Sequence, residues 1–143
     1  MLVEKIQIAA FTYFSSGMTL LQADMGAKFL VNSILIQGRA DANQWVTRFK
    51  VRVSDDTLHW VNVLSDGTTT DAADGFVFQG NTDRNTVVQV TFENPILTRH
   101  VRLLPQAFVG HYSLRWEILA CEAPGGLYHS KCINKKNASF SGL

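Results

Sequence analysis

Four histidines are the side chains of this sequence that could most readily transfer a proton near neutral pH: His59, His100, His111 and His129. A catalytic histidine needs a nucleophile or a metal beside it. The sequence contains no G-x-S-x-G, H-E-x-x-H or Cys/His motif that would supply one. We therefore interpret all four as surface or strand histidines.

A carboxylate pair is the second arrangement that could carry chemistry. Asp55 and Asp56 are adjacent, and adjacent residues of a strand point to opposite sides, which does not suit a paired acid and base for glycoside cleavage. They are better explained as turn residues. A nucleotide-binding glycine motif is also missing from the sequence. The sequence therefore predicts a protein that is not an enzyme.

Recognition without catalysis fits one polar segment better. Gly38–Gln44, GRADANQ, follows the dense apolar run Phe29–Gln37, so a rigid strand would hold a loop rich in hydrogen-bonding groups. Such groups suit sugar hydroxyls, an anionic head group or a protein surface. We predict a ligand site made of Arg39, Asp41, Asn43, Gln44 and Trp45. A solvated turn without a ligand remains the alternative.

Tryptophan rings can pack on the apolar side of a pyranose. Trp45 lies at the edge of the polar loop, and both sugar stacking and ordinary packing are open for it. Trp116 alternates with Leu114 and Ile118 in a predicted strand, and it is interpreted, like Trp60, as a packing residue.

Short alternating segments separated by turn signals predict an all-β fold. The predicted strands are Phe29–Gln37, Val46–Ser54, Leu58–Val63, Val87–Phe92, Thr98–Leu104 and Tyr112–Leu119. Pro95 marks a turn between two of them, and Ser65–Gly75 is a long polar loop. Residues 1–23 are interpreted as a first strand; a signal peptide is the alternative, for which the polar residues of this stretch are unfavourable.

Composition limits the possible partners. The 143 residues suit one domain, with 46% hydrophobic and 17% charged residues and a net charge of +1. Lys and Arg are scattered among acids, which argues against a nucleic-acid surface. The sequence has no apolar run of the roughly 20 residues that a membrane helix needs. Cys121 and Cys132 lack the spacing of a zinc site, and they could pair or stay free.

Three blocks between Ile34 and Cys121 resemble the discoidin domain, or F5/8 type C domain. They are ILIQGRADANQWVTRFKVRVSDDTLHW, FVFQGNTDRNTVV and ILTRHVRLLPQAFVGHYSLRWEILAC. The resemblance implies a galactose-binding-like antiparallel β-sandwich or jelly-roll barrel with projecting ligand loops. It places the domain at residues 1–121 and a tail at 122–143. Cys121 matches the family's final cysteine, but its N-terminal partner is missing, and the first ligand loop is shortened to about Phe11–Thr19.

The resemblance also implies a function. The family supplies binding modules, so we expect an extracellular, secreted or cell-surface adhesion module, or lectin, that recognises a cell-surface glycan or glycoprotein. An anionic phospholipid surface is the alternative partner, with Phe11, Tyr13 and Phe14 as the residues that could insert. An accessory binding domain of a larger enzyme is a third possibility. No cofactor is expected, and the sequence gives no support for a structural calcium ion. Within the family Asp83 and Arg84 recur, so Asn81–Asn85 is expected to lock itself through side-chain to backbone hydrogen bonds.

Overall fold

The computed structural model describes residues 4–6, 11–15 and 18–122, with side chains described from Leu20 onward. These residues form nine strands and no helix. The strands are β1 Glu4–Ile6, β2 Phe11–Ser15, β3 Met18–Gln37, β4 Trp45–Ser54, β5 Val61–Val63, β6 Thr69–Thr70, β7 Phe78–Gln79, β8 Val88–Val109 and β9 Arg115–Glu122.

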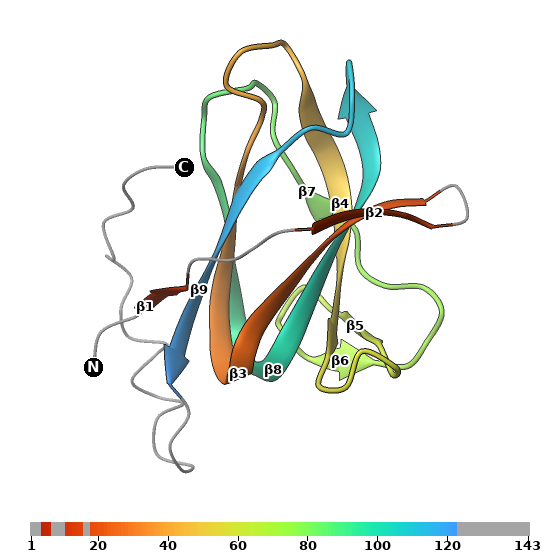
Figure 1. Cartoon of the computed structure of the whole chain (residues 1–143), viewed down its shortest axis with the longest axis vertical. Helices are drawn as coiled ribbons and strands as arrows, with labels where there is room; N and C mark the ends of the chain where they lie inside the picture. The colour runs from red at the N-terminus through yellow and green to blue at the C-terminus, as the bar shows by residue number, and fades with distance from the viewer. Residues whose placement is uncertain (1–3, 7–10, 16–17, 123–143) are drawn as a thin grey trace.

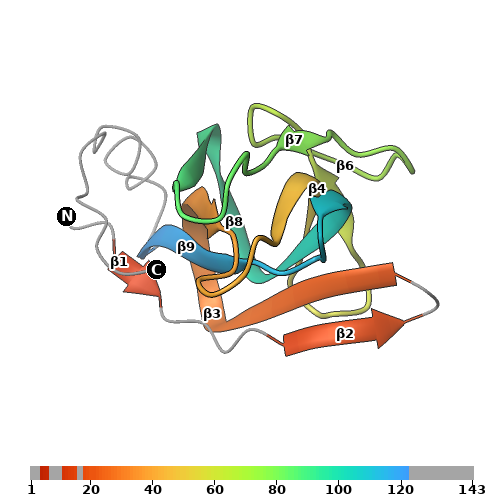
Figure 2. The same cartoon turned by 90° about the horizontal axis from the view of Figure 1, so that it is seen from above.

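All strand pairings in this part of the chain are antiparallel and belong to one sheet. Its order is β1-β9-β3-β8-β4-β5-β6, with β2 on β3 and β7 on β4. The sheet curls around its own inner face into an open barrel (Figures 1 and 2). The all-β antiparallel fold expected from the sequence is therefore confirmed.

The inner face of the curled sheet is the hydrophobic core. Alternation along β4 sends Val51 and Val53 inward while Lys50 and Arg52 face outward, as the two-residue period of a strand requires. Phe78 packs against Phe49 and Phe92 at ring-centroid distances of 5.6 and 6.0 Å. Trp116 belongs to the same cluster, so its packing role is confirmed.

The two longest strands are each bent. β3 pairs with β8 from Leu21 to Ile36, but the register shifts twice. At one shift Val31 faces Ile96 while Ser33 faces Thr91, so residues 92–95 of β8 bulge out of the ladder. The prediction that Pro95 ends a strand is therefore wrong. Proline has no N–H to donate, which a bulge tolerates without ending the strand.

The bend returns β8 to the end of the barrel from which it started. Its first residue, Val88, pairs with Ile36 of β3, and its last, Val109, pairs with Trp45 of β4. Both ends of β8 therefore lie near the connection between β3 and β4, at the top of Figure 1.

The predicted hairpin after β4 is confirmed. Arg52 faces Asn62 and Val53 faces Val61. Asp56 closes the connection, its Oδ1 accepting the backbone N–H groups of Leu58 and His59 at 2.8 and 2.9 Å. The segment Phe11–Thr19, expected as a short loop, forms the β2–β3 hairpin instead, pairing Phe11–Ser15 with residues 18–22.

The segment that was predicted to form the C-terminal tail lies largely outside the described residues. β9 runs to Glu122, one residue past the predicted domain end, and the rest of the predicted tail, with His129 and Cys132, lies outside. Cys121 is buried and takes part in a disulfide. Among the described residues, no helix is long and apolar enough to span a membrane.

Asp24 gives the fold a measurable pH dependence. Its carboxylate accepts from Arg99 Nε at 2.8 Å and from the Gly26 N–H at 2.8 Å, and His100 Nδ1 lies 3.8 Å away. The Arg99 hydrogen bond is the largest cause that lowers the pKa of Asp24 from 3.8 to about 2. A carboxyl group whose pKa is depressed by folding stabilises the fold above its unfolded pKa and loses that contribution as the pH falls through its folded pKa.

We expect Asp24→Asn to be less stable than the parent near pH 6, with the difference shrinking toward about pH 2. Thermal melts across this range measure it. Asp74→Asn is the control, because the structure gives the exposed Asp74 side chain no hydrogen bond within the described residues. An Asp24→Asn difference that stays constant with pH would contradict the assignment.

Candidate functional site

Three connections meet at the upper end of the barrel in Figure 1. They are the β3–β4 loop at Gly38–Gln44, the β7–β8 loop at residues 80–87 and the β8–β9 loop at residues 110–114. We call them together the loop end. They converge because β3 ends here and β9 begins here, beside both ends of the bent β8.

Arg115 at the start of β9 joins two of these loops. Its Nε donates to the carbonyl of Gly38 at 2.8 Å, and its Nη2 donates to the carbonyl of Arg84 at 3.2 Å. A side chain on Gly38 would meet Arg84 Cα at 2.6 Å and the Gln44 carbonyl at 2.8 Å. Only glycine lets the loops approach this closely, so the first loop is fixed against the second.

The β7–β8 loop locks itself, as the sequence analysis expected. Asp83 Oδ1 accepts the N–H groups of Asn85 and Thr86 at 2.8 and 2.6 Å, and Asp83 Oδ2 accepts the Thr86 hydroxyl at 2.7 Å. These bonds lower the pKa of Asp83, the Thr86 N–H being the largest cause. Asn81 Nδ2 reaches back to the carbonyl of Ile36 at 3.1 Å, and Gln37 Nε2 bonds the Asn85 carbonyl.

Within Gly38–Gln44, Arg39 is engaged by its own loop. Its Nε lies 2.6 Å from Asp41 Oδ1, and its Nη1 lies 3.3 Å from Gln44 Oε1. The Arg39 guanidinium lowers the pKa of Asp41 through this hydrogen bond. Arg39 and Asp41 are both exposed. Arg39 and Asp41 therefore form an exposed ion pair in which each side chain fixes the orientation of the other.

Asn43, Gln44 and Trp45 differ from one another. Gln44 is half-buried, and its Oε1 also accepts the Ser113 hydroxyl at 2.9 Å. Asn43 is exposed, and its side chain makes no hydrogen bond within the described residues. Trp45 is half-buried at the start of β4, opposite Val109. Asn43 is thus the amide of this loop most available to a partner.

The end of β8 and the third loop supply aromatic groups that were not among the predicted site residues. The rings of Phe108 and Tyr112 lie 4.0 Å apart, and Phe108 is 42% exposed. Gly110 has a positive φ of 74°, and a Cβ atom at this position would lie only 2.8 Å from the Asn43 carbonyl oxygen. The aromatic pair therefore borders the polar loop. The spacing of aromatic residues around Gly110 in FVGHY was the available signal.

A serine and a histidine also meet here. His111 Nδ1 lies 3.2 Å from Ser113 Oγ, the distance of a nucleophile and its base. However, the Ser113 hydroxyl donates to Gln44 Oε1, whereas an activated serine must donate its proton to the histidine. The pair is better explained as support for Gln44.

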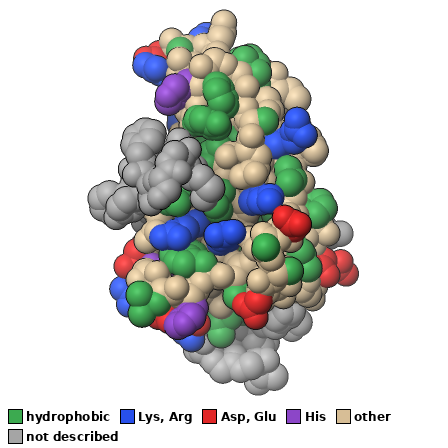
Figure 3. Space-filling model, turned by 90° about the vertical axis from the view of Figure 1, so that its right-hand side faces the viewer, with side chains coloured by type: hydrophobic (Ala, Val, Ile, Leu, Met, Phe, Trp, Pro, Cys, Tyr) green, Lys and Arg blue, Asp and Glu red, His purple; other side chains and the backbone are tan. Residues whose placement is uncertain are grey.

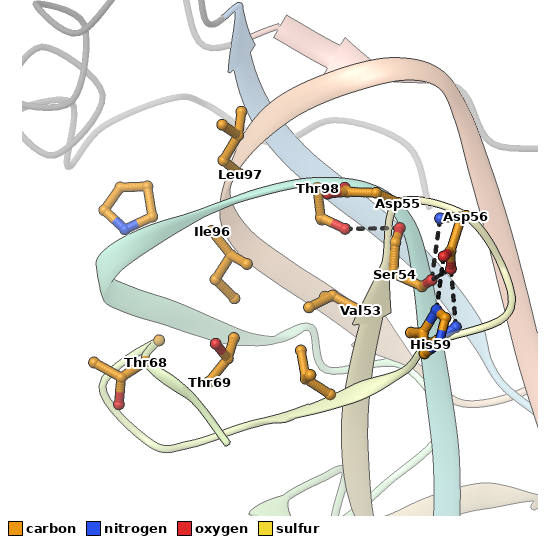
Figure 4. Close-up of a pocket in the computed structure, with 13 residues that line it drawn as sticks. Val53, Ser54, Asp55, Asp56, His59, Thr68, Thr69, Ile96, Leu97 and Thr98 are labelled. Atoms are coloured by element: carbon orange, nitrogen blue, oxygen red, sulfur yellow. Dashed lines mark hydrogen bonds and ion pairs between the residues drawn. The ribbon is translucent and has the colours of Figure 1, made fainter. Parts of the chain in front are cut away.

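A cavity of about 600 Å³ lies at the opposite end of the barrel, between the end of β4 and the bend of β8 (Figure 4). Val53, Ile96 and Leu97 give it an apolar wall. Its polar groups bond one another: His59 Nδ1 is 2.8 Å from Asp56 Oδ2, and Thr98 Oγ1 donates to the Ser54 carbonyl at 3.0 Å. Asp56, chiefly through its hydrogen bond to His59, has a strongly lowered pKa, and that of His59 is raised.

The described residues hold no group of three or more His, Cys, Asp or Glu side chains that could bind an ion.

Comparison with known proteins identifies the family. The model of the F5/8 type C domain matches residues 12–118. The chain belongs to the F5/8 type C, or discoidin, domain family. It is 40% identical to pig lactadherin over 103 residues, which are 71% of this chain and 24% of lactadherin. It is 38% identical over 88 residues to discoidin-2 of Dictyostelium discoideum, covering 62% of this chain and 31% of that protein.

Solved structures agree on the fold. Discoidin II of Dictyostelium discoideum superposes with a TM-score of 0.65 at 29% identity, covering 82% of this chain and 43% of that one. A CBM32 domain from a family 31 glycoside hydrolase of Clostridium perfringens gives 0.56 at 13% identity, covering 78% of this chain and 94% of that one. At this identity the second match shows the fold alone.

As a member of this family, the present chain is a binding module, as expected from its sequence. It spans less than half the length of these curated relatives.

Gly38 tests how the loop end is held together. We expect Gly38→Ala to destabilise the fold by about 1–3 kcal/mol, because the added methyl group overlaps the backbone of Arg84 and Gln44. Chemical denaturation measures the loss, and amide spectra should shift in the β7–β8 loop as well. Ala40→Ser, at an exposed position of the same loop, is the control. Equal stability of the two variants would show that the loops do not depend on this contact.

Proposed function

We propose that this discoidin domain is a non-catalytic, extracellular adhesion or lectin-like module that recognises a cell-surface glycan or glycoprotein through its loop end. The observation that carries the proposal is the polar loop Gly38–Gln44, with its exposed Arg39, Asp41 and Asn43, beside the aromatic pair of exposed Phe108 and half-buried Tyr112. Sugar recognition commonly needs both, an apolar ring face and fixed hydrogen-bonding groups.

Each proposed contact follows from the geometry. Arg39 and Asp41 present donors and acceptors whose directions their mutual hydrogen bonds already set. Asn43 offers an amide, while Gln44 and Trp45 hold the loop to the barrel. A ligand therefore meets groups that lose little conformational freedom when it binds.

The proposed role requires no bond to be broken. His59 is hydrogen-bonded to Asp56, and His100 is buried in β8. The Ser113 hydroxyl donates its proton to Gln44 rather than to a histidine, as a nucleophile would. A bound glycan should be recovered unchanged. If the chain is a piece of a larger enzyme, catalysis belongs to another part of it.

An anionic phospholipid surface is the second candidate partner. One observation favours it: Phe108 and Val109 are 42% and 41% exposed at the loop end, where apolar side chains could enter a bilayer surface. The side chains of Phe11, Tyr13 and Phe14, considered for the same role, lie outside the described ones.

The double variant Arg39→Ala/Asn43→Ala tests the site. We expect weaker binding by about 1–3 kcal/mol, the range for hydrogen bonds lost at a desolvated site, and a nearly unchanged melting temperature. A glycan array identifies the ligand, and titration calorimetry on the best hit measures the affinity.

Phosphatidylserine vesicles, assayed in parallel with the double variant and with Phe108→Ser, separate the two partners. Glycan binding that depends on Arg39 and Asn43, without vesicle binding, supports the proposal. Vesicle binding lost in Phe108→Ser, without any glycan binding, supports the membrane alternative. Normal glycan binding by the double variant would place the site elsewhere.

A further inference from the structure

The outer face of the sheet places two arginines directly opposite each other. Arg52 of β4 and Arg102 of β8 are partners in the antiparallel register. Their neighbours Val51 and Val101 face the core, so both arginines face outward. Opposed residues have Cβ atoms about 4.5–5.5 Å apart, and like charges there destabilise the strand pair.

A third cation extends this arrangement. Lys50 precedes Arg52 by two residues on the same outward face of β4. All three side chains belong to half-buried residues. In the side view, Lys and Arg side chains form a band across the middle of the face (Figure 3).

Neutral groups orient the two guanidinium groups. Arg52 Nε donates to Asn62 Oδ1 at 2.9 Å, and Arg102 Nε donates to Gln22 Oε1 at 2.8 Å. The guanidinium carbon of Arg102 also lies 3.8 Å from the ring centroid of Trp60. Asn62 fixes the direction of the Arg52 guanidinium without cancelling its charge, and Gln22 and Trp60 fix the direction of Arg102.

The ion pairs that the structure gives to Asp24, Asp41, Asp55 and Asp56 involve other cations. Their partners are Arg99, Arg39, Lys28 and His59. Within the described residues, Arg52 and Lys50 form no ion pair. The opposed charges on β4 and β8 are thus held close together while the charge on at least Arg52 and Lys50 remains available.

We propose that Lys50, Arg52 and Arg102 bind an anionic glycan through a sulfate or carboxylate group. An oxyanion beside these side chains accepts charge-assisted hydrogen bonds from the opposed guanidinium groups and meets the uncompensated charges of Lys50 and Arg52. Gln22, which is half-buried beside Arg102, is a neutral amide suited to a neighbouring hydroxyl, whereas the buried Asn62 only orients Arg52. This site lies on the side of the barrel, is separate from the loop end, and does not require the proposed function to hold.

A single glycan chain fits this position better than a membrane does. The cations are half-buried along the strands of the sheet rather than at the tips of projecting loops. A flexible chain can lie along such a face, whereas a bilayer surface contacts protruding residues first.

Inorganic sulfate is the first probe. Thermal melts of the parent in sodium sulfate should lie above those in sodium chloride of equal ionic strength, because sulfate bridges the opposed cations. Sulfate also stabilises folded proteins in general because it is excluded from their surface, so Arg52→Gln should lose only the specific part of this difference, which Arg48→Gln should retain. Arg48→Gln is the matched control: it removes one charge from the same strand, at a position that faces Ala107 and Gln79.

A sulfated oligosaccharide and its unsulfated counterpart are the second pair of probes. The sulfated form should bind the parent more tightly, and Lys50→Gln/Arg52→Gln should weaken that binding by about tenfold or more. Arg48→Gln and the loop-end variant Arg39→Ala/Asn43→Ala should retain it. Loss in the loop-end variant alone would place anionic glycans at the loop end and overturn this proposal.

Three other results would also overturn it. The parent could melt equally in sulfate and chloride, or Arg48→Gln could lose as much as Arg52→Gln, which would indicate a diffuse charge effect. The protein could bind phosphatidylserine vesicles in a way that requires Arg52 and fail to bind the sulfated oligosaccharide, which would make the partner a membrane. None of these outcomes decides whether the loop end binds its own ligand.

Discussion

The paired bend of β3 and β8 is the constraint on which the rest of this structure depends. A straight strand of 22 residues would carry its two ends far apart, but the bulge at residues 92–95 lets β8 reverse while most of it stays paired with β3. Both ends of β8 then reach the same end of the barrel. The loops before and after it are brought beside the β3–β4 loop, although they lie far apart in the sequence.

Hydrogen bonds to backbone carbonyls hold these loops more than contacts between side chains do. Arg115 bonds the carbonyls of Gly38 and Arg84, and Asn81 bonds that of Ile36. A charged donor to a carbonyl forms a stronger bond than a neutral one, and a bond to the backbone leaves exposed side chains such as Asn43 available. Recognition and support are therefore assigned to different residues, which allows the exposed residues of Gly38–Gln44 to vary without loss of the fold.

The two ends of the barrel and its side differ in the state of their polar groups. At the cavity beside the β8 bend, Asp56 and His59 satisfy each other. At the loop end, Arg39 and Asp41 are paired but exposed, and Asn43 is exposed as well. On the sheet face, Arg52 and Arg102 are oriented by neutral amides. The unused amide of Asn43 and the charge of Arg52, which has only a neutral partner, distinguish these two places from the cavity, where Asp56 and His59 bond each other.

The sequence by itself determined the strand content, the inward faces of β4 and β9, and the self-locking loop at Asp83, because each depends on residues close in the chain. Two-residue alternation and turn residues act over a few positions. It also indicated the family, through three blocks in order. Tertiary structure alone decided that Pro95 sits in a bulge, that Phe108 and Tyr112 border Gly38–Gln44, and that Arg52 faces Arg102. These facts depend on strand register, which is set by how the whole sheet packs its core and which no local pattern encodes.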